Sequence, residues 1–329
     1  MSTLVDNFGR QINYVRLAVT DRCNLRCQYC MPANGIEIVP RKELLTYKEM
    51  YRIIRVLTEL GVQKVRLTGG EPFVRKDFMS FLEMLSYNDL LHDINITTNG
   101  ALIKKHINTL EKLPKVKNIN LSIDSLQADK FAKITRRDVF NEVMDTFYAL
   151  EKSSLQLKLN VVIQSGINTD EITDFVALTK HKNIAVRFIE EMPFNGNGLR
   201  ATNENWSFQK ILTTIKNDYE IQEITPEKSS TSRNYKINGH IGSVGIIPAF
   251  TRTICNDCNR IRITSTGTLK NCLFDDGVFN LRDFIRKGAS NNDLKNLFLQ
   301  LVKQKPENGF VAEANRKQHV SESMSTIGG

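Results

Sequence analysis

Residues 47–72 read YKEMYRIIRVLTELGVQKVRLTGGEP, and this stretch contains one complete unit of the predicted fold. Its first half repeats apolar side chains at the spacing of one helix face: Met50, Ile53, Ile54 and Leu57. A short β-branched and apolar run follows at residues 64–68 and predicts a buried strand. The strand ends at Gly69-Gly70-Glu71-Pro72, which is typical of a turn. A helix that leads directly into a buried strand is the unit of a parallel sheet with crossover helices.

The same alternation extends over the first 189 residues. Further strands are predicted at 15–19, 94–97, 119–123, 157–163 and 185–189. Further helices are predicted near 78–85, 102–113, 139–150 and 171–181. Six β–α units in succession favour a parallel α/β sheet, either open and doubly wound or closed into a barrel. In both architectures ligands bind at the carboxyl ends of the strands. The notable polar residues follow strands, at 21–30, 69–72, 99–100, 124 and 190–192.

The pattern changes near residue 200. A helix is predicted at 208–215, and Asn238-Gly239 predicts a hairpin between 235–237 and 241–247. Two short helices are predicted near 281–286 and 294–301, and the residues after them are polar and show no periodicity. We therefore predict three regions. They are an α/β region at 1–200, an α+β region at 201–304, and a flexible tail at 305–329 that ends in Gly328-Gly329.

Composition indicates the compartment and the class of partner. The chain has 329 residues and a formal net charge of +9, which favours polyanionic partners such as nucleic acid or phosphate-rich metabolites. No apolar run reaches the ~18–20 residues that a membrane helix needs. The N-terminus has no basic start followed by an apolar stretch, so no secretory signal is expected. We therefore expect a cytoplasmic protein that has no membrane partner.

Six cysteines form two groups of three. Cys23, Cys27 and Cys30 have the spacing C-x3-C-x2-C, and Cys255, Cys258 and Cys272 have the spacing C-x2-C-x13-C. In a reducing compartment, clustered cysteines point to metal binding or catalysis rather than to disulfides. Three thiolates suit a four-iron cluster with one open iron, because a closed structural site needs a fourth ligand. Zinc with a distant histidine such as His240 remains the open alternative, particularly for the second group.

The segment Cys23-Asn24-Leu25-Arg26-Cys27-Gln28-Tyr29-Cys30 resembles the signature of the radical S-adenosylmethionine superfamily. Gly69-Gly70-Glu71-Pro72 is similar to the methionine-binding motif of that superfamily. Two glycines let the backbone approach a ligand closely, and the acidic side chain is expected to meet an ammonium group. The resemblance implies an α/β fold. It is an incomplete (βα)6 TIM-type barrel of the radical S-adenosylmethionine superfamily, with a C-terminal extension that carries a second cluster.

Nearly the whole chain resembles one subfamily, the GTP 3′,8-cyclases of molybdenum cofactor (molybdopterin) biosynthesis. The similarity extends from Asn7-Phe8-Gly9-Arg10 to Ile327-Gly328-Gly329 and includes Cys255 to Arg262. It implies a lyase that cleaves S-adenosylmethionine reductively to a 5′-deoxyadenosyl radical. That radical takes hydrogen from C3′ of GTP, and closure of C3′ onto C8 gives 3′,8-cyclo-7,8-dihydroguanosine 5′-triphosphate.

The resemblance also assigns residues. It implies two [4Fe-4S] clusters, one held by Cys23, Cys27 and Cys30 and the other by Cys255, Cys258 and Cys272. The residues expected to contact S-adenosylmethionine are Tyr29, Gly70, Ser122 and Met192. Those expected to contact GTP are Arg16, Arg66, Thr97, Lys158, Arg260, Ile261 and Arg262. No catalytic side chain is assigned beyond the clusters. Independently of the resemblance, Arg66 and Lys158 lie inside predicted strands, where an inward-facing charge is costly unless it meets an anion.

Two other functions compete with this interpretation. A peptide-modifying radical enzyme shares the first cysteine group but usually carries more cysteines near the C-terminus. A zinc-containing nucleic-acid-binding protein fits the basic charge, yet the interleaved aromatic and basic residues of single-strand binders are not evident. We therefore expect GTP as the substrate and no nucleic-acid partner. The resemblance further implies a homodimer, a low-potential electron donor, and cyclic pyranopterin monophosphate synthase as the next enzyme.

Overall fold

The computed structural model describes residues 3–194, 206–225, 228–317 and 322–328. Six parallel strands form the middle of its sheet: β1 (Tyr14–Ala18), β2 (Lys64–Thr68), β3 (Asp93–Thr98), β4 (Val116–Ser122), β5 (Gln156–Ile163) and β6 (Ala185–Glu190). They pair in chain order, each with the next. The six predicted strands and their parallel arrangement are thereby confirmed.

Strands from the C-terminal part of the chain extend this sheet at both edges. They are β7 (Ile221–Glu223), β8 (Arg233–Ile237), β9 (Ser243–Ile247), β10 (Arg260–Ile263), β11 (Thr268–Lys270) and β12 (Phe279–Asn280). The order across the sheet is β12-β11-β10-β1-β2-β3-β4-β5-β6-β9-β8-β7. β9 is parallel to β6 and β10 is parallel to β1, while the outermost strands are antiparallel. Among the described residues β12 and β7 do not pair, so the barrel is incomplete, as predicted.

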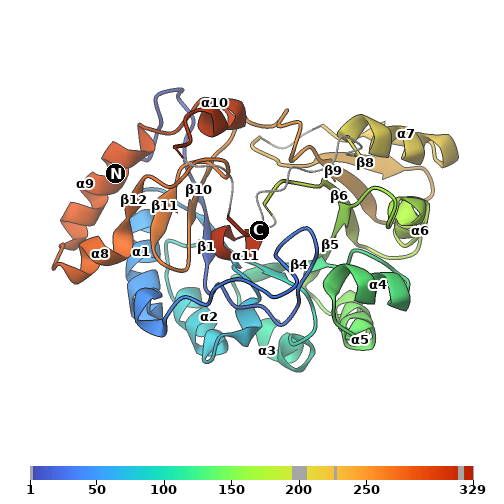
Figure 1. Ribbon diagram of the computed structural model, residues 1–329, viewed down its shortest axis with the longest axis horizontal. Coiled ribbons are helices and arrows are strands. Elements are labelled where there is room, and N and C mark those ends of the chain that lie inside the picture. Colours follow the sequence, from blue (N-terminus) through green and yellow to red (C-terminus); the bar gives the residue numbers. More distant parts are fainter. Residues whose placement is uncertain (1–2, 195–205, 226–227, 318–321, 329) are drawn as a thin grey trace.

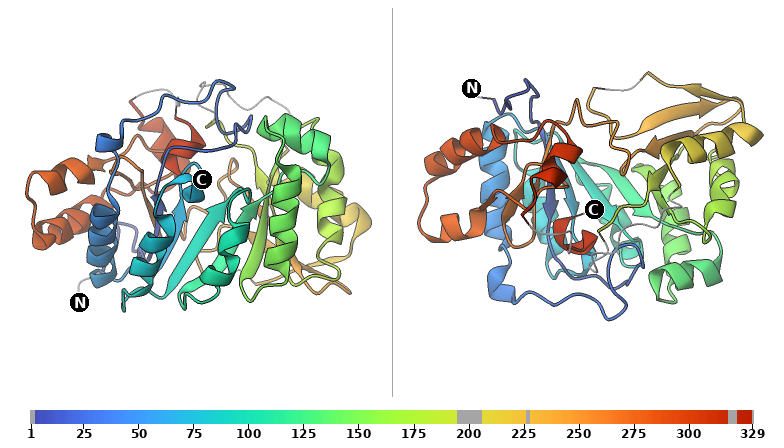
Figure 2. Two further views of the ribbon diagram at one scale, coloured as in Figure 1. Left: turned by 90° about the horizontal axis from the view of Figure 1, so that it is seen from below. Right: turned by 45° about the horizontal axis from the view of Figure 1, so that its top comes forward.

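The described residues form eleven α-helices, most of which cover the outer face of the curved sheet (Figures 1 and 2). They are α1 (Tyr47–Glu59), α2 (Phe78–Ser86), α3 (Ile107–Leu110), α4 (Ala128–Thr135), α5 (Phe140–Glu151), α6 (Ile172–Ala177), α7 (Phe208–Asp218), α8 (Leu281–Arg286), α9 (Asn291–Val302), α10 (Gly309–Ala314) and α11 (Met324–Ile327). Single turns of 3-10 helix occur at Arg41–Glu43, Pro72–Val74, Lys104–His106 and Thr169–Glu171. None of the described helices is long and apolar enough to cross a membrane.

The alternation of side chains along each strand separates the core from the interior of the barrel. On β1, Val15 and Leu17 are fully buried among apolar side chains of the main core. Arg16 lies between them in the sequence and projects from the other face, into the barrel. A continuous apolar layer therefore forms between sheet and helices, and polar side chains collect on the concave face.

Some elements differ from the prediction. The helix expected at 102–113 is only a 3-10 turn followed by α3, and α4 and β10–β12 were not predicted. The hairpin around Asn238-Gly239 is confirmed by the antiparallel pairing of β8 with β9. The expected flexible tail, residues 305–329, holds α10 and α11 in the structure, and α11 lies at the centre of the open side (Figures 1 and 2). The division of the chain at residue 200 stays a prediction, because strands from both sides belong to one sheet.

Candidate active site

The first cysteine group lies on the loop that follows β1. Backbone N–H groups of this loop donate to the end of α4: Arg26 N to Thr135 O at 2.9 Å, and Gln28 N to Ile134 O at 3.0 Å. Cys30 N donates to Cys27 O at 3.0 Å, which forms a tight turn between the second and third cysteines. All three side chains line one cavity at the carboxyl ends of the strands.

The second cysteine group belongs to the C-terminal part of the chain and lines the same cavity. Cys255 and Cys258 precede β10, and Cys258 N donates to Cys255 O at 3.1 Å. Cys272 follows β11, where its N–H donates to Asp275 Oδ2 at 2.7 Å. Because β10 pairs with β1, thiols more than two hundred residues apart in the sequence face a common space of about 290 Å³.

The two groups differ in their electrostatic surroundings. Burial raises the pKa of Cys23 to about 11 and that of Cys30 to about 12. Burial also acts to raise the pKa of Cys258, but the nearby cations Lys305, Arg260 and Arg10 lower it to about 6. The surroundings of Cys258 are therefore basic, whereas burial raises the pKa of Cys272 in the same group despite the opposing effect of Lys305.

The donor set fits iron–sulfur clusters. Each group supplies three thiols to the cavity, and no cysteine is in a disulfide. Within the residues that the structure describes, no three Cys, His, Asp or Glu side chains converge around a single metal-ion position. A cluster that carries each thiolate on a different iron atom does not need such convergence, whereas a structural zinc ion does.

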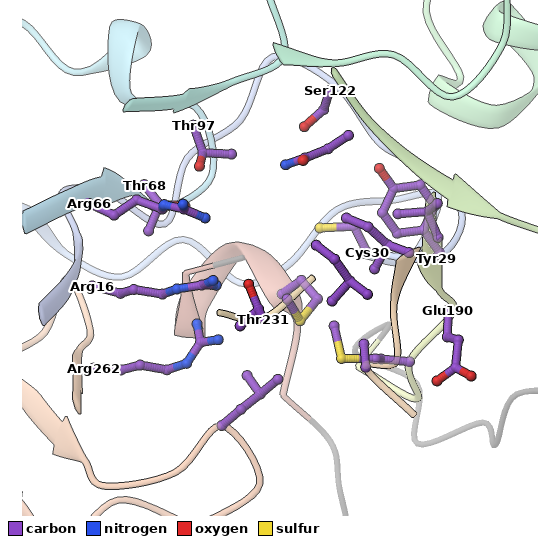
Figure 3. Close-up of a pocket in the computed structure, with 18 of the residues that line it drawn as sticks. Arg16, Tyr29, Cys30, Arg66, Thr68, Thr97, Ser122, Glu190, Thr231 and Arg262 are labelled. Atoms are coloured by element: carbon purple, nitrogen blue, oxygen red, sulfur yellow. The ribbon is translucent and has the colours of Figure 1, made fainter. Parts of the chain in front are cut away.

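Three arginines form a row on neighbouring strands of the barrel wall. The register pairs Arg16 of β1 with Arg262 of β10 on one side and with Arg66 of β2 on the other. All three side chains point into the cavity (Figure 3). Burial, followed by the adjacent Arg262 and Arg66, holds the pKa of Arg16 well below its ordinary value. Burial likewise lowers the pKa of Arg262 to about 10. Three adjacent like charges, one buried and two partly buried, are costly together, so this wall is suited to a polyanion.

Other residues expected to contact GTP are placed differently. Thr97 lines the cavity, and its buried hydroxyl has no hydrogen-bond partner in the described part of the chain. Arg260 also lines it, but its Nη2 donates to Ser229 O at 2.6 Å. Lys158 is on the same face of β5 as Asn160, yet it lines a second cavity nearer the amino ends of the strands. The Ile261 side chain is fully buried in the apolar core on the opposite face of β10.

All four residues expected to contact S-adenosylmethionine line the cavity: Tyr29, Gly70, Ser122 and Met192. Tyr29 and Ser122 lie across the cavity from the arginine row (Figure 3). The Tyr29 hydroxyl donates to Asp124 Oδ2 at 2.8 Å, which fixes the ring beside the cysteine loop. A Cβ at Gly70 would overlap the Arg22 carbonyl oxygen, so only glycine lets these two backbones approach.

The expectation for Glu71 is wrong. Its carboxylate is fully buried and accepts hydrogen bonds from Phe73 N at 3.1 Å, Thr98 Oγ1 at 2.9 Å and Asn99 N at 2.7 Å. It is not among the side chains that line the cavity, so it braces the loops after β2 and β3 and does not meet a ligand ammonium. Burial raises the pKa of Glu71 to about 7.

The sequence analysis placed Glu190 among the notable residues that follow strands but gave it no role, and it did not single out Thr231. Glu190, at the end of β6, accepts from Phe208 N at 2.6 Å and from Phe250 N and Thr251 N at 2.8 Å each. It therefore ties α7 and the segment that leads to Cys255 to the barrel. Thr231 also lines the cavity and appears beside Arg16 and Arg262 in Figure 3. An acidic residue at a strand end was a visible signal for Glu190, whereas no sequence signal marked Thr231.

The C-terminal segment closes one side of the cavity. Ser323 Oγ donates to Cys30 O at 2.6 Å, and Met324 lines the cavity. Arg262 Nη1 donates to the carbonyl oxygen of Gly328. This bond holds Gly328 beside the arginine of β10, while Gly329 lies outside the described residues.

Comparison with known proteins agrees with this arrangement. The Radical SAM superfamily model matches residues 17–179, and the Molybdenum Cofactor Synthesis C model matches residues 184–311. The GTP 3′,8-cyclase of Geobacter sulfurreducens is 40% identical over 99% of this chain and 99% of its own. The GTP 3′,8-cyclase of Peptoclostridium acidaminophilum is 38% identical over 100% of this chain and 99% of its own. The crystal structure of Streptococcus suis SuiB bound to S-adenosylmethionine shares the fold. Its TM-score is 0.57 at 17% identity, over 81% of this chain and 61% of that one.

Proposed function

This chain belongs to the GTP 3′,8-cyclase family of radical S-adenosylmethionine enzymes, and from that premise we propose how its residues divide the work of the reaction. It is an enzyme that cyclises GTP to 3′,8-cyclo-7,8-dihydroguanosine 5′-triphosphate in molybdenum cofactor synthesis. The observation that carries the proposal is that two three-cysteine groups and a row of three arginines face one cavity.

The arginine row binds the triphosphate in this proposal. Arg16, Arg66 and Arg262 are held on paired strands, so their guanidinium groups present a fixed set of donors. Guanidinium forks match phosphate oxygens in pairs, and Thr97 adds one hydroxyl donor. Arg260 serves the same anion once its bond to Ser229 is exchanged. Lys158 contributes from the floor of the barrel, and Ile261 contributes only through its backbone.

S-adenosylmethionine binds across the cavity from the arginines. Gly70 offers backbone at close range, Tyr29 and Ser122 offer polar contacts, and Met192 offers an apolar wall. Cys23, Cys27 and Cys30 hold a [4Fe-4S] cluster there. When bound, this cluster supplies the electron that cleaves S-adenosylmethionine and so starts hydrogen abstraction from C3′. The protein keeps C3′ near the cleaved end and excludes water from the buried space.

Cys255, Cys258 and Cys272 hold a second [4Fe-4S] cluster in this proposal. Their thiols open on the same cavity as the arginine row, so a purine whose phosphates bind the arginines reaches them. The basic surroundings of Cys258 favour its thiolate form, which is the form that ligates iron. The group then orients the guanine base and does not cleave S-adenosylmethionine.

We also propose the setting in which the enzyme works. It is a cytoplasmic homodimer that takes electrons from a low-potential donor. Its product passes to cyclic pyranopterin monophosphate synthase. No nucleic-acid or membrane partner is part of the proposal.

The proposal is tested on protein reconstituted without oxygen. Iron and sulfide are measured first, and two four-iron clusters predict about eight irons per chain. The protein is then incubated with dithionite, S-adenosylmethionine and GTP, and 5′-deoxyadenosine and a cyclised guanosine triphosphate are read by mass spectrometry. Formation of both supports the proposal. 5′-Deoxyadenosine with unchanged GTP would refute the substrate, and zinc without cleavage would refute the radical chemistry.

A further inference from the structure

Lys305 is a buried lysine between α9 and α10, and its side chain reaches the start of β10 and the residue after β11. Only 3% of its surface is exposed. Its Nζ donates to Arg260 O at 2.8 Å and to Asn271 O. In the described part of the chain no carboxylate forms an ion pair with it. A buried ammonium that meets only neutral carbonyls has lost its hydration without gaining an opposite charge, so an anion close to it is expected.

Lys305 Nζ is bonded to backbone carbonyls close in sequence to Cys258 and Cys272, so thiolates of the second cysteine group are candidates for that anion. Both cysteines line the cavity, and Lys305 lies behind them. A cluster ligated by three thiolates carries net negative charge, which a buried cation at this position offsets.

Lys305 also joins the two segments that carry the cysteines. Arg260 is two residues beyond Cys258, and Asn271 immediately precedes Cys272. One ammonium group therefore bridges the C-x2-C segment and the distant third cysteine.

The residues after Lys305 are fixed from the other side by Arg10. Arg10 Nη1 donates to Glu307 O at 2.6 Å and to Cys255 O at 3.1 Å, and its Nη2 donates to Pro306 O at 2.6 Å. Asp6 Oδ2 forms an ion pair with Nε of the same guanidinium at 2.6 Å. Residues 305–307 are thus bonded, directly or through Arg10, to the backbone beside each cysteine of the group.

We propose that Lys305 is a positioning residue for the second cluster, which it supports by bridging the two cysteine segments and by offsetting the negative charge of the cluster. This inference rests on the proposed presence of that cluster. It predicts that loss of the ammonium weakens cluster retention and makes the cluster harder to reduce, because added positive charge near a cluster stabilises its reduced form.

The test uses full-length protein in which Cys23, Cys27 and Cys30 are replaced by Ser, so that only the second group can hold a cluster. Lys305→Met, Lys305→Arg and the exposed control Lys303→Met are compared in this background after anaerobic reconstitution. Iron per chain, the rate of iron loss to a chelator, and the midpoint potential from EPR-monitored titration are measured. We expect Lys305→Met to lose iron about 10–100-fold faster and to show a more negative potential. Lys305→Arg should lie between Lys305→Met and the parent, and Lys303→Met should match the parent.

A second background separates this role from general folding. In protein whose Cys255, Cys258 and Cys272 are replaced by Ser, Lys305→Met should leave the iron content of the first group unchanged. Loss of iron from the first group as well would show that Lys305 stabilises the fold in general and not the second cluster in particular. That result would overturn the inference. Iron loss and potential equal to the parent in the first background would also overturn it. A parent that binds no iron at the second group would overturn both the second cluster and this role of Lys305.

Discussion

Replacing Arg16 by Gln should change GTP affinity and the stability of the free protein in opposite directions. Arg16 lies between Arg262 and Arg66 on paired strands, and burial and these two neighbours already disfavour its charged form. Without ligand, Arg16→Gln removes a buried charge and two like-charge contacts. We expect the free energy of unfolding to rise by about 1–3 kcal/mol. For a chain of this length that corresponds to a rise in Tm of about 2–4 °C.

GTP binding should weaken in the same variant. A hydrogen bond to a charged group contributes about 1.5–3 kcal/mol, which corresponds to a roughly 10–150-fold rise in Kd. At a GTP concentration of about 100 times the wild-type Kd, the ligand stabilises the wild-type protein by about 2.7 kcal/mol and the variant by no more than about 1.4 kcal/mol. The advantage in Tm that the variant has without GTP should therefore shrink or reverse when GTP is present.

The measurements are anaerobic isothermal titration calorimetry with GTP and thermal unfolding with and without GTP. Arg55→Gln is the matched control, because Arg55 is an exposed residue of α1 that pairs with Glu59 and lies away from the cavity. It should leave the Kd for GTP unchanged. A Kd of Arg16→Gln for GTP within two-fold of the wild-type value would refute the reasoning. A Tm of the ligand-free variant below that of the wild type would refute it as well.

Three further changes test other parts of the site. Gly70→Ala should abolish S-adenosylmethionine binding in equilibrium dialysis, because the added Cβ overlaps the Arg22 carbonyl. Binding by Gly70→Ala equal to that of the wild type would contradict this reasoning. Glu190→Gln should lower the free energy of unfolding by about 2–3 kcal/mol, since one carboxylate oxygen that accepts from Phe250 and Thr251 is lost. Chemical denaturation measures it, with the exposed Glu220→Gln as control. An unchanged midpoint would show that Glu190 is not a brace. Ser323→Ala removes the bond to Cys30 O and the N-cap of α11, at a cost of about 1–2 kcal/mol. Amide exchange at residues 324–328 should quicken roughly 5–30-fold, and unchanged exchange would count against this anchor.

Local patterns in the sequence predicted the centre of the fold. The β-branched run at residues 64–68 coincides with β2, and the helix that begins at Tyr47 has the capping box of Thr46 and Glu49. In such segments the hydrophobic period and the turn residues are contained within the element itself, so one sequence suffices to find them.

Pairing between distant segments was not predictable in this way. β10, with the sequence RIRI, is too short to show a clear period, and only its pairing with β1 makes Arg262 a neighbour of Arg16. The direction of the Glu71 carboxylate depends on backbone N–H groups from another loop. Lys305 was expected to be the first residue of a flexible tail, but it is buried because its ammonium bonds to the carbonyls of Arg260 and Asn271. These features depend on partners that no local pattern reveals.

The position of β10 beside β1 has a consequence for how the protein is made. β10 supplies Arg262 and pairs with β1 on the side away from β2. β1 and its neighbours leave the ribosome long before β10 does. Until residues beyond 270 have been synthesised, the edge of β1 is unpaired in the nascent chain. The cavity then lacks the wall that the second cysteine group provides. Contacts of such large sequence separation form slowly, and an open sheet edge in the meantime can pair with other chains. We therefore expect cluster insertion to follow release of the finished chain, and chaperones to protect the β1 edge until then.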